Sequence, residues 1–343
     1  MKKTITKNKL PTMYDVARLA GVSQPTVSRV LNHNDTAVSI SDDTRLRVLA
    51  AIDELGYRPN ALARSLRTQR TQTVALLIAD LANGFYHPIA RAVQDVARQH
   101  DYEVFIANSD HLYEHEKHFC NIVSRRSVDG VIMVPIHLTT EDLTRFIAQN
   151  NTPVVVLGEQ IDHQEIDVVY TDDEKATYEA TMWMIKECGY TSLGFIGAMD
   201  DFPPGPRRYK GFMRALTESG LSLDPRFLFK GNFTRESGEE IAHKLLTIGE
   251  LPRGLMIIND LMAIGAMLTL QEAGCRIPQD LAVIGFDDIP EATIVRPALT
   301  TIAQHPREMG QRLAELLFSR IENPSIERRI QEASYDLVVR DSA

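Results

Sequence analysis

Polar side chains able to read nucleic-acid bases gather in one short segment of the chain. The segment carries amide, hydroxyl and guanidinium groups at Gln24, Thr26, Ser28, Arg29 and Asn32. Arginine pairs bidentately with guanine, glutamine pairs with adenine, and hydroxyls bind phosphates or base edges. These residue types on one outward helix face therefore indicate binding in the major groove of DNA. The alternative is an ordinary helical hairpin with a solvated polar face.

The elements that must position these side chains are two short helices joined by a sharp turn. Gly21 tolerates the positive φ that such a turn needs, and Ser23 is placed to cap the second helix. Apolar residues at helical spacing predict the two buried faces. These are Val16, Leu19 and Ala20 on the first helix and Val27, Val30 and Leu31 on the second. Residues 13–32 are therefore predicted to form a helix-turn-helix.

A third helix is predicted over residues 41–57, and Gly56 is its stop signal. Its apolar side is expected to consist of Leu46, Leu49, Ile52 and Leu55. Three helices of this length are large enough to enclose a small core.

The segment that follows, residues 57–72, is more than a plain linker. Asn60 can cap a short helix running from residue 61 to about residue 67. Arg64 and Arg67 make that helix basic, while Leu66 is an exposed apolar residue among them. A bare linker would not be expected to carry helix formers and an exposed leucine.

From residue 73 onward, short apolar runs alternate with amphipathic helix-length stretches. Apolar runs of this kind predict parallel strands covered on both faces. They lie at residues 74–79, 103–107, 130–134 and 153–157, and again at 193–197, 226–230, 255–259 and 281–286. Two successive α/β units suggest two lobes, with a ligand in the crevice at the carboxyl ends of their strands.

Polar and aromatic residues stand where these strands end. Phe85 and Tyr86, beside Asn83, could form a stacking wall for a sugar or a flat ring, or could pack under the next helix. Asn259 ends a strand, and Asp260 is placed to cap the helix that follows. Further candidates are Arg208 at a helix start, Asp287 at a strand end and Gln304 in the segment 300–306.

The motif YDVARLAGVSQPTVSRVLN, the segment PNALARSL and the core motifs resemble the LacI family of transcriptional regulators essentially from end to end. The resemblance implies an all-α helix-turn-helix domain followed by a two-lobed α/β core like the ribose-type periplasmic binding proteins. It further implies a sequence-specific regulator, acting as a repressor, that binds a palindromic operator in double-stranded DNA as a homodimer. A small-molecule effector between the lobes, a sugar or related metabolite, would control operator affinity. No cofactor is implied.

By this resemblance, Gln24, Pro25 and Arg29 occupy base-reading positions, and Leu66 is the hinge leucine that wedges into the minor groove. Pro25 departs from the usual polar residue, so its base contact would be apolar. The whole set expected to contact DNA is Tyr14, Gln24, Pro25, Thr26, Ser28, Arg29, Asn32, Asn60, Ala63, Arg64 and Leu66.

The same resemblance implies an effector-binding set at the strand ends. Arginine and aspartate in one cleft would bind vicinal hydroxyls, while aromatic faces would stack on a ring. The set is Asn83, Phe85, Tyr86, Glu159, Arg208, Asn259, Asp287 and Gln304. Gly158 and Glu159 stand where many sugar-binding relatives have an acidic-basic pair, which leaves the ligand open.

The distribution of charge along the chain agrees with the domains that the sequence predicts. The expected domains are residues 11–59 (DNA binding), 60–72 (hinge) and 73–343 (effector binding and dimerisation). Residues 1–72 hold 12 Lys and Arg against 6 Asp and Glu, a net charge of +6, so the remainder carries −15 of the total of −9. A basic segment at residues 1–72 joined to an acidic remainder confines nucleic-acid affinity to that segment.

Several function classes are disfavoured. The first ten residues lack the apolar segment of a signal peptide, and no run of 18 apolar residues occurs, so we expect a cytoplasmic protein. No nucleophile, base and acid set is apparent, and no metal site is expected. His111, His115 and His118 could bind a metal, although a solvated helix face explains them better. Control by a protein co-effector, as in the catabolite control protein, and a solute receptor without DNA binding are the remaining alternatives.

Overall fold

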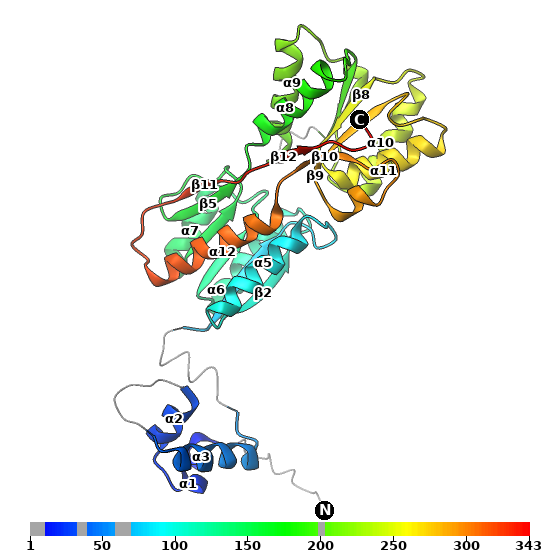
Figure 1. Ribbon diagram of the computed structural model, residues 1–343. Coiled ribbons are helices and arrows are strands. Elements are labelled where there is room, and N and C mark those ends of the chain that lie inside the picture. The colour runs from blue at the N-terminus through cyan, green and yellow to red at the C-terminus, as the bar shows by residue number, and fades with distance from the viewer. Residues whose placement is uncertain (1–10, 33–39, 59–69, 198–202) are drawn as a thin grey trace, which may run out of the picture. The chain divides into compact units, whose positions relative to one another are not determined.

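The computed structural model describes residues 11–32, 40–58, 70–197 and 203–343 of the chain (Figure 1). The chain divides into two compact units, residues 1–71 and 72–343, and each is described by itself. The predicted hinge helix, including Asn60, Ala63, Arg64 and Leu66, lies outside the described residues.

The first unit contains helices α1 (Met13–Ala20), α2 (Gln24–Asn32) and α3 (Asp42–Leu55). Thr12 and Asp15 form a capping box at the start of α1, which satisfies backbone N–H groups that the helix leaves unpaired. The Oγ of Ser23 accepts a hydrogen bond from the N–H of Thr26 at 3.4 Å, so its predicted capping role is confirmed. Gly21 ends α1 with a φ of 65°, as a sharp turn requires.

Three leucines predicted on buried helix faces lie on the surface instead. Leu19 is 46% exposed, Leu46 66% and Leu49 46%, so these predictions were wrong. Mainly valines and alanines fill the interior of this unit instead, because short side chains let the backbones of the three helices approach one another. The buried residues are Val16, Ala17, Ala20, Val27, Val30, Val48, Ala51 and Tyr57.

The second unit is built on two six-stranded sheets. The first has the strand order β11-β5-β4-β3-β1-β2, and all its pairings are parallel. The second has the order β12-β10-β9-β8-β6-β7 and is parallel except where β12 pairs with β10. The strands are β1 (Thr73–Ile78), β2 (Glu103–Asn108), β3 (Gly130–Met133), β4 (Val154–Leu157), β5 (Ile166–Tyr170), β6 (Leu193–Ile196), β7 (Leu228–Phe229), β8 (Gly254–Ile257), β9 (Ala282–Asp287), β10 (Thr300–Ala303), β11 (Ile330–Glu332) and β12 (Asp336–Val338).

Helices cover both faces of each sheet, so the sheets are doubly wound (Figure 1). The helices of the first lobe are α5 (Tyr86–Gln99), α6 (Tyr113–Arg126), α7 (Thr140–Asn150) and α12 (Pro306–Glu322). Those of the second lobe are α8 (Asp173–Lys186), α9 (Gly205–Glu218), α10 (Arg235–Thr247) and α11 (Asp260–Glu272). Short 3-10 turns lie at Pro225–Phe227 and Pro290–Thr293. The predicted fold class is confirmed.

The chain passes between the lobes three times, near residues 170–173, 303–306 and 332–336. After the second passage, α12 returns to the first lobe and packs beside α5 (Figure 1). Buried Asp167 on β5 anchors this return, because it accepts hydrogen bonds from Arg320 at 2.7 Å and from Arg329 at 2.7 Å. Each lobe therefore contains segments that are distant in sequence.

Candidate DNA-binding and effector-binding sites

The second helix of the first unit presents polar groups to solvent. Gln24, Pro25 and Arg29 are exposed, and Thr26 and Ser28 are half-buried. Pro25 lies in the first turn of α2, where its missing N–H removes no hydrogen bond of the helix. Tyr14 on α1 is also exposed, whereas the side chain of Asn32 lies outside the description. The arrangement leaves Gln24 and Arg29 free to reach a groove of DNA.

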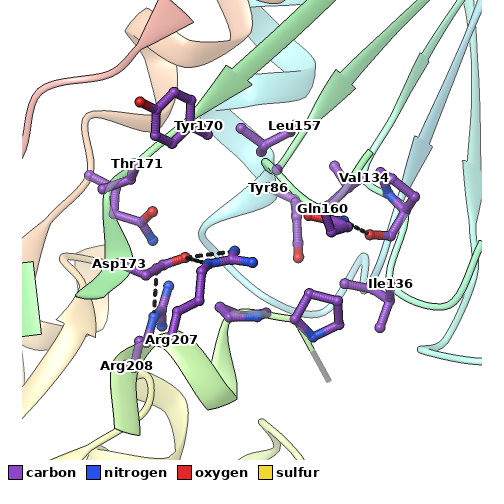
Figure 2. A pocket seen from close by; sticks show the side chains of 15 residues that line it. Tyr86, Val134, Ile136, Leu157, Gln160, Tyr170, Thr171, Asp173, Arg207 and Arg208 are labelled. Carbon is purple, nitrogen blue, oxygen red and sulfur yellow. Dashed lines mark hydrogen bonds and ion pairs between the residues drawn. The ribbon is translucent and has the colours of Figure 1, made fainter. Parts of the chain in front are cut away.

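Two adjoining pockets occupy the cleft between the lobes of the second unit. The wider one encloses about 520 Å³, including its opening, and is bounded by Tyr86 and Ile136 from the first lobe and Arg208 from the second (Figure 2). The narrower one encloses about 350 Å³ and shares these three residues. Both lie where parallel strands of the two sheets end, as expected for ligand sites of α/β folds.

Six of the eight predicted effector-binding residues line these pockets: Asn83, Phe85, Tyr86, Arg208, Asp287 and Gln304. The rings of Phe85 and Tyr86 meet edge to face with centroids 5.1 Å apart. Burial, aided by Asp287, raises the pKa of the Tyr86 phenol, so this group is a neutral donor at ordinary pH.

Arg208 is buried and held from three directions. Its Nε donates to Oδ1 of Asp173 at 2.8 Å, and its Nη1 donates to the carbonyl of Ile258. The guanidinium also lies 3.4 Å from the centroid of the Phe286 ring. An arginine that is already ordered loses little further freedom when it binds a ligand, so this group is preorganised.

Asp287 ends β9 with a φ of 121°, a conformation that non-glycine residues rarely adopt. Burial raises the pKa of its carboxyl to about 7, against the opposing influence of Arg208. Strained backbone and a displaced pKa commonly occur together at functional sites. Asp287 can therefore offer either an acceptor or a donor to a ligand near neutral pH.

Asn259 is committed to the fold. Its Oδ1 accepts from the N–H of Met262 at 3.1 Å, and its Nδ2 donates to the carbonyl of Phe233 at 2.9 Å. It lines neither pocket, and it caps α11 from an extended conformation with a φ of −152°. The prediction that Asp260 is this cap was wrong, because Asp260 is already inside the helix and its carboxylate accepts from Thr301 at 2.6 Å.

Glu159 also lies outside the pocket linings, at the cleft's edge on the first lobe. It forms an ion pair with the Nε of Arg207 at 2.9 Å. Since Arg207 belongs to α9 of the second lobe, this pair links the two lobes.

Sequence reasoning missed several pocket residues. Asp173 contacts both Arg207 and Arg208, and Tyr170 and Thr171 precede it at the end of β5 (Figure 2). The strand β5 was itself missed, because Asp167 interrupts its apolar run. The paired acids of the segment TDDEK, directly after a strand, are the signal that could have revealed this edge of the site.

Comparison with known proteins decides the family. Residues 12–60 match the family described as bacterial regulatory proteins, lacI family, and residues 184–343 match the periplasmic binding protein-like domain. The chain is 35% identical over 332 residues to catabolite control protein A of Priestia megaterium, covering 96% of this chain and 98% of the relative. The chain belongs to the LacI family.

Other LacI-family proteins agree over nearly the full length. The transcriptional repressor PurR of Aliivibrio salmonicida (strain LFI1238) is 32% identical, with 97% of this chain and 99% of that protein covered. The lac repressor dimer bound to operator and the anti-inducer ONPF superposes with a TM-score of 0.85 at 27% identity, covering 97% and 99% of the two chains. A LacI-family regulator from Enterococcus faecium with bound ribose superposes with a TM-score of 0.72 at 28% identity, covering 79% of this chain and 98% of that chain.

This LacI-family protein is thus a DNA-binding transcriptional regulator under small-molecule control, as its sequence predicts. The comparisons do not support a solute receptor without DNA binding, because the matched relatives are transcriptional regulators. Among the described residues, no group of histidine, cysteine, aspartate and glutamate side chains could hold a metal ion. In that same part of the chain, no helix is long and apolar enough to cross a membrane.

Proposed function

We propose that this protein is a dimeric repressor that binds a palindromic operator and responds to an effector in the interlobe cleft. One observation carries the proposal: Arg208 and Asp287, both buried, and Tyr86 from the opposite lobe converge on one cleft, in a chain that begins with a helix-turn-helix. A ligand touching both lobes favours one lobe arrangement over another, which is what control of a distant site requires.

On the DNA side, we assign base reading to Gln24, Pro25 and Arg29 of α2. Their exposure and the net charge of +6 over residues 1–72 support this assignment. Tyr14, Thr26, Ser28 and Asn32 are proposed as further contacts. The hinge at residues 60–72, with Asn60, Ala63, Arg64 and Leu66, is proposed to reach the minor groove, as the resemblance implies.

Control by the effector is proposed to be a population shift between lobe arrangements. A ligand that prefers one arrangement by ~3 kcal/mol would change operator affinity roughly a hundredfold. Asn83, Phe85, Tyr86, Arg208, Asp287 and Gln304 are the proposed contacts. Asn259 is left out, since both polar atoms of its amide are used within the fold. The protein is proposed to act in the cytoplasm and to have no enzymatic activity.

The test starts with an operator selected from random duplexes by the full-length protein. Operator affinity is then measured between about 50 and 200 mM salt. The slope of log affinity against log salt concentration should be about −5 or steeper for a dimer on two half-sites. A slope near zero, or a single half-site that binds as tightly as the palindrome, would contradict dimeric operator binding.

The effector arm is a thermal-shift screen of the same protein with sugars, sugar acids, nucleosides and purine bases. A ligand at a hundred times its dissociation constant should add ~2.7 kcal/mol to the free energy of unfolding. Each ligand found is then added to the operator titration. Ligands that bind the cleft without changing operator affinity would contradict the regulatory role.

A further inference from the structure

The first turn of α9 brings positive charge to the wider pocket. Arg207 is the third residue of the helix and lines this pocket together with Arg208 (Figure 2). Pro204 at the N-cap provides no side-chain hydrogen bond, and the first turn contains no acidic residue. Helix N-termini favour anions and disfavour cations. Two arginines at this end therefore need negative charge beside them.

The negative charge that the protein itself supplies is only partly buried. One carboxylate oxygen of Asp173 accepts a hydrogen bond from Nη2 of Arg207 at 2.9 Å, and the other accepts one from Nε of Arg208 at 2.8 Å. The second partner of Arg207 is Glu159 at the cleft's edge, whose side chain is 39% exposed. Exposed ion pairs of this kind contribute little free energy, so a ligand can replace Glu159 at low cost.

Arg207 is open on the pocket side. Its side chain is 24% exposed, and among the described residues only its Nε and Nη2 have partners, Asp173 and Glu159. A ligand oxyanion can take the place of the Glu159 carboxylate at Nε while Asp173 keeps its bond to Nη2, and Nη1 remains a further donor.

A second feature of the same pocket points to a ligand. Thr171 is 95% buried, and its Oγ1 has no hydrogen-bond partner among the described residues although it lines the pocket. Buried hydroxyls are almost always hydrogen-bonded in folded proteins. This hydroxyl can donate to an oxyanion held by Arg207.

We propose that the effector carries a carboxylate or phosphate group, which Arg207 and the first turn of α9 bind in place of Glu159. The proposal rests on the proposed function, since it assumes that the cleft is the effector site. The remaining walls, formed by Val134, Ile136, Leu157 and Tyr170, suit an apolar or cyclic body attached to the acid. Because Glu159 and Arg207 belong to different lobes, the exchange also removes an ion pair between the lobes.

Calorimetry on the full-length protein tests the anion site with two probes. Inorganic phosphate is compared with chloride at equal ionic strength, and benzoate is compared with benzamide, so the phosphate and carboxylate sources are separated. We expect wild-type protein to bind at least one anion and to bind neither chloride nor benzamide. Glu159→Gln removes the competing carboxylate and should bind that anion about tenfold more tightly, equivalent to about 1.4 kcal/mol.

Variants on one helix provide the matched comparison. Arg207→Gln should lose anion binding, whereas Arg207→Lys should keep a weakened form of it, because lysine retains the charge without the fork. Arg214→Gln, further along α9 and outside the pocket, should bind the anion as wild type does. Thermal unfolding of each variant checks its fold. The proposal is overturned if Glu159→Gln binds neither anion, or if Arg207→Gln binds as tightly as wild type.

Operator titrations in the presence of the bound anion separate this proposal from the proposed function. Anion binding that depends on Arg207 but leaves operator affinity unchanged would support the anion site and contradict effector control through the cleft. Control of operator affinity by a neutral ligand, with no anion bound even by Glu159→Gln, would leave the proposed function standing and overturn the anion site.

Discussion

Gln304 donates a hydrogen bond from Nε2 to Oδ1 of Asp287 at 2.7 Å, and both side chains are buried. The two residues lie at the ends of neighbouring parallel strands, since Ala303, the last residue of β10, pairs with Asp287 at the end of β9. Gln304 immediately follows β10, where the chain leaves the second lobe for the first. This bond therefore couples a cleft carboxylate to an interlobe passage.

Asp287→Ala should weaken effector binding by ~1–3 kcal/mol, because its loss leaves the ligand group and Gln304 without a buried partner. Calorimetry with the effector found by the screen measures the loss. Asp224→Ala, on the surface of the same lobe, is the control and should bind as wild type does. Unchanged affinity in Asp287→Ala, together with a lower melting temperature, would assign the carboxylate to the fold instead.

The free energy of unfolding should depend on pH through Asp287. The pKa of this carboxyl rises from 3.8 to about 7 on folding. Between pH 3.8 and about 7, the folded state therefore keeps a proton on Asp287 that the unfolded state has lost. The stabilising contribution is complete below about pH 4 and is lost as the pH rises through 7, by at most about 4 kcal/mol. Denaturant titrations of wild type and Asp287→Asn across this range measure the difference. Parallel pH profiles for the two proteins would contradict the raised pKa.

Asn259→Ala should lower stability by ~1–2 kcal/mol, since it removes the cap of α11 and the bond to the carbonyl of Phe233. Urea unfolding checks this value. Effector affinity should hold under conditions where the variant is fully folded. A loss of affinity as large as that of Asp287→Ala would return Asn259 to the effector-binding set.

Arg29→Ala should cost ~1–3 kcal/mol of specific operator binding and relax the base preference at one position of each half-site. Repeating the operator selection with the variant reports the preference. Arg18→Ala, an exposed arginine on α1 paired with Asp15, is the matched control. A variant at position 29 that keeps full base preference would show that Arg29 contacts only phosphate or solvent.

The sequence predicts what depends on local pattern. Buried parallel strands appear as continuous apolar runs, and Gly21 and Ser23 mark the helix boundaries of the helix-turn-helix. Chain order also places Asp287 at a strand end and Arg208 at a helix start, and the family resemblance assigns these two residues and Gln304 to one cleft.

Prediction failed where a residue's role depends on partners distant in the chain. Leu46 and Leu49 have the spacing of a buried face, yet the three helices of the first unit pack through Val48 and Ala51. The strand containing Asp167 was missed, because a carboxylate inside a strand is tolerated only with Arg320 and Arg329 beside it.

The sequence by itself therefore determined the fold class, the family and six of the residues that line the cleft, since these follow from periodicity and from motifs contiguous in the chain. Only the tertiary structure decided that Asp173 holds Arg207 and Arg208, and that Glu159 reaches Arg207 across the lobes. The physical reason is that hydrogen bonds and ion pairs act over a few ångströms, whereas the residues that make them are separated by 34 or more positions. Folding alone brings such groups within reach.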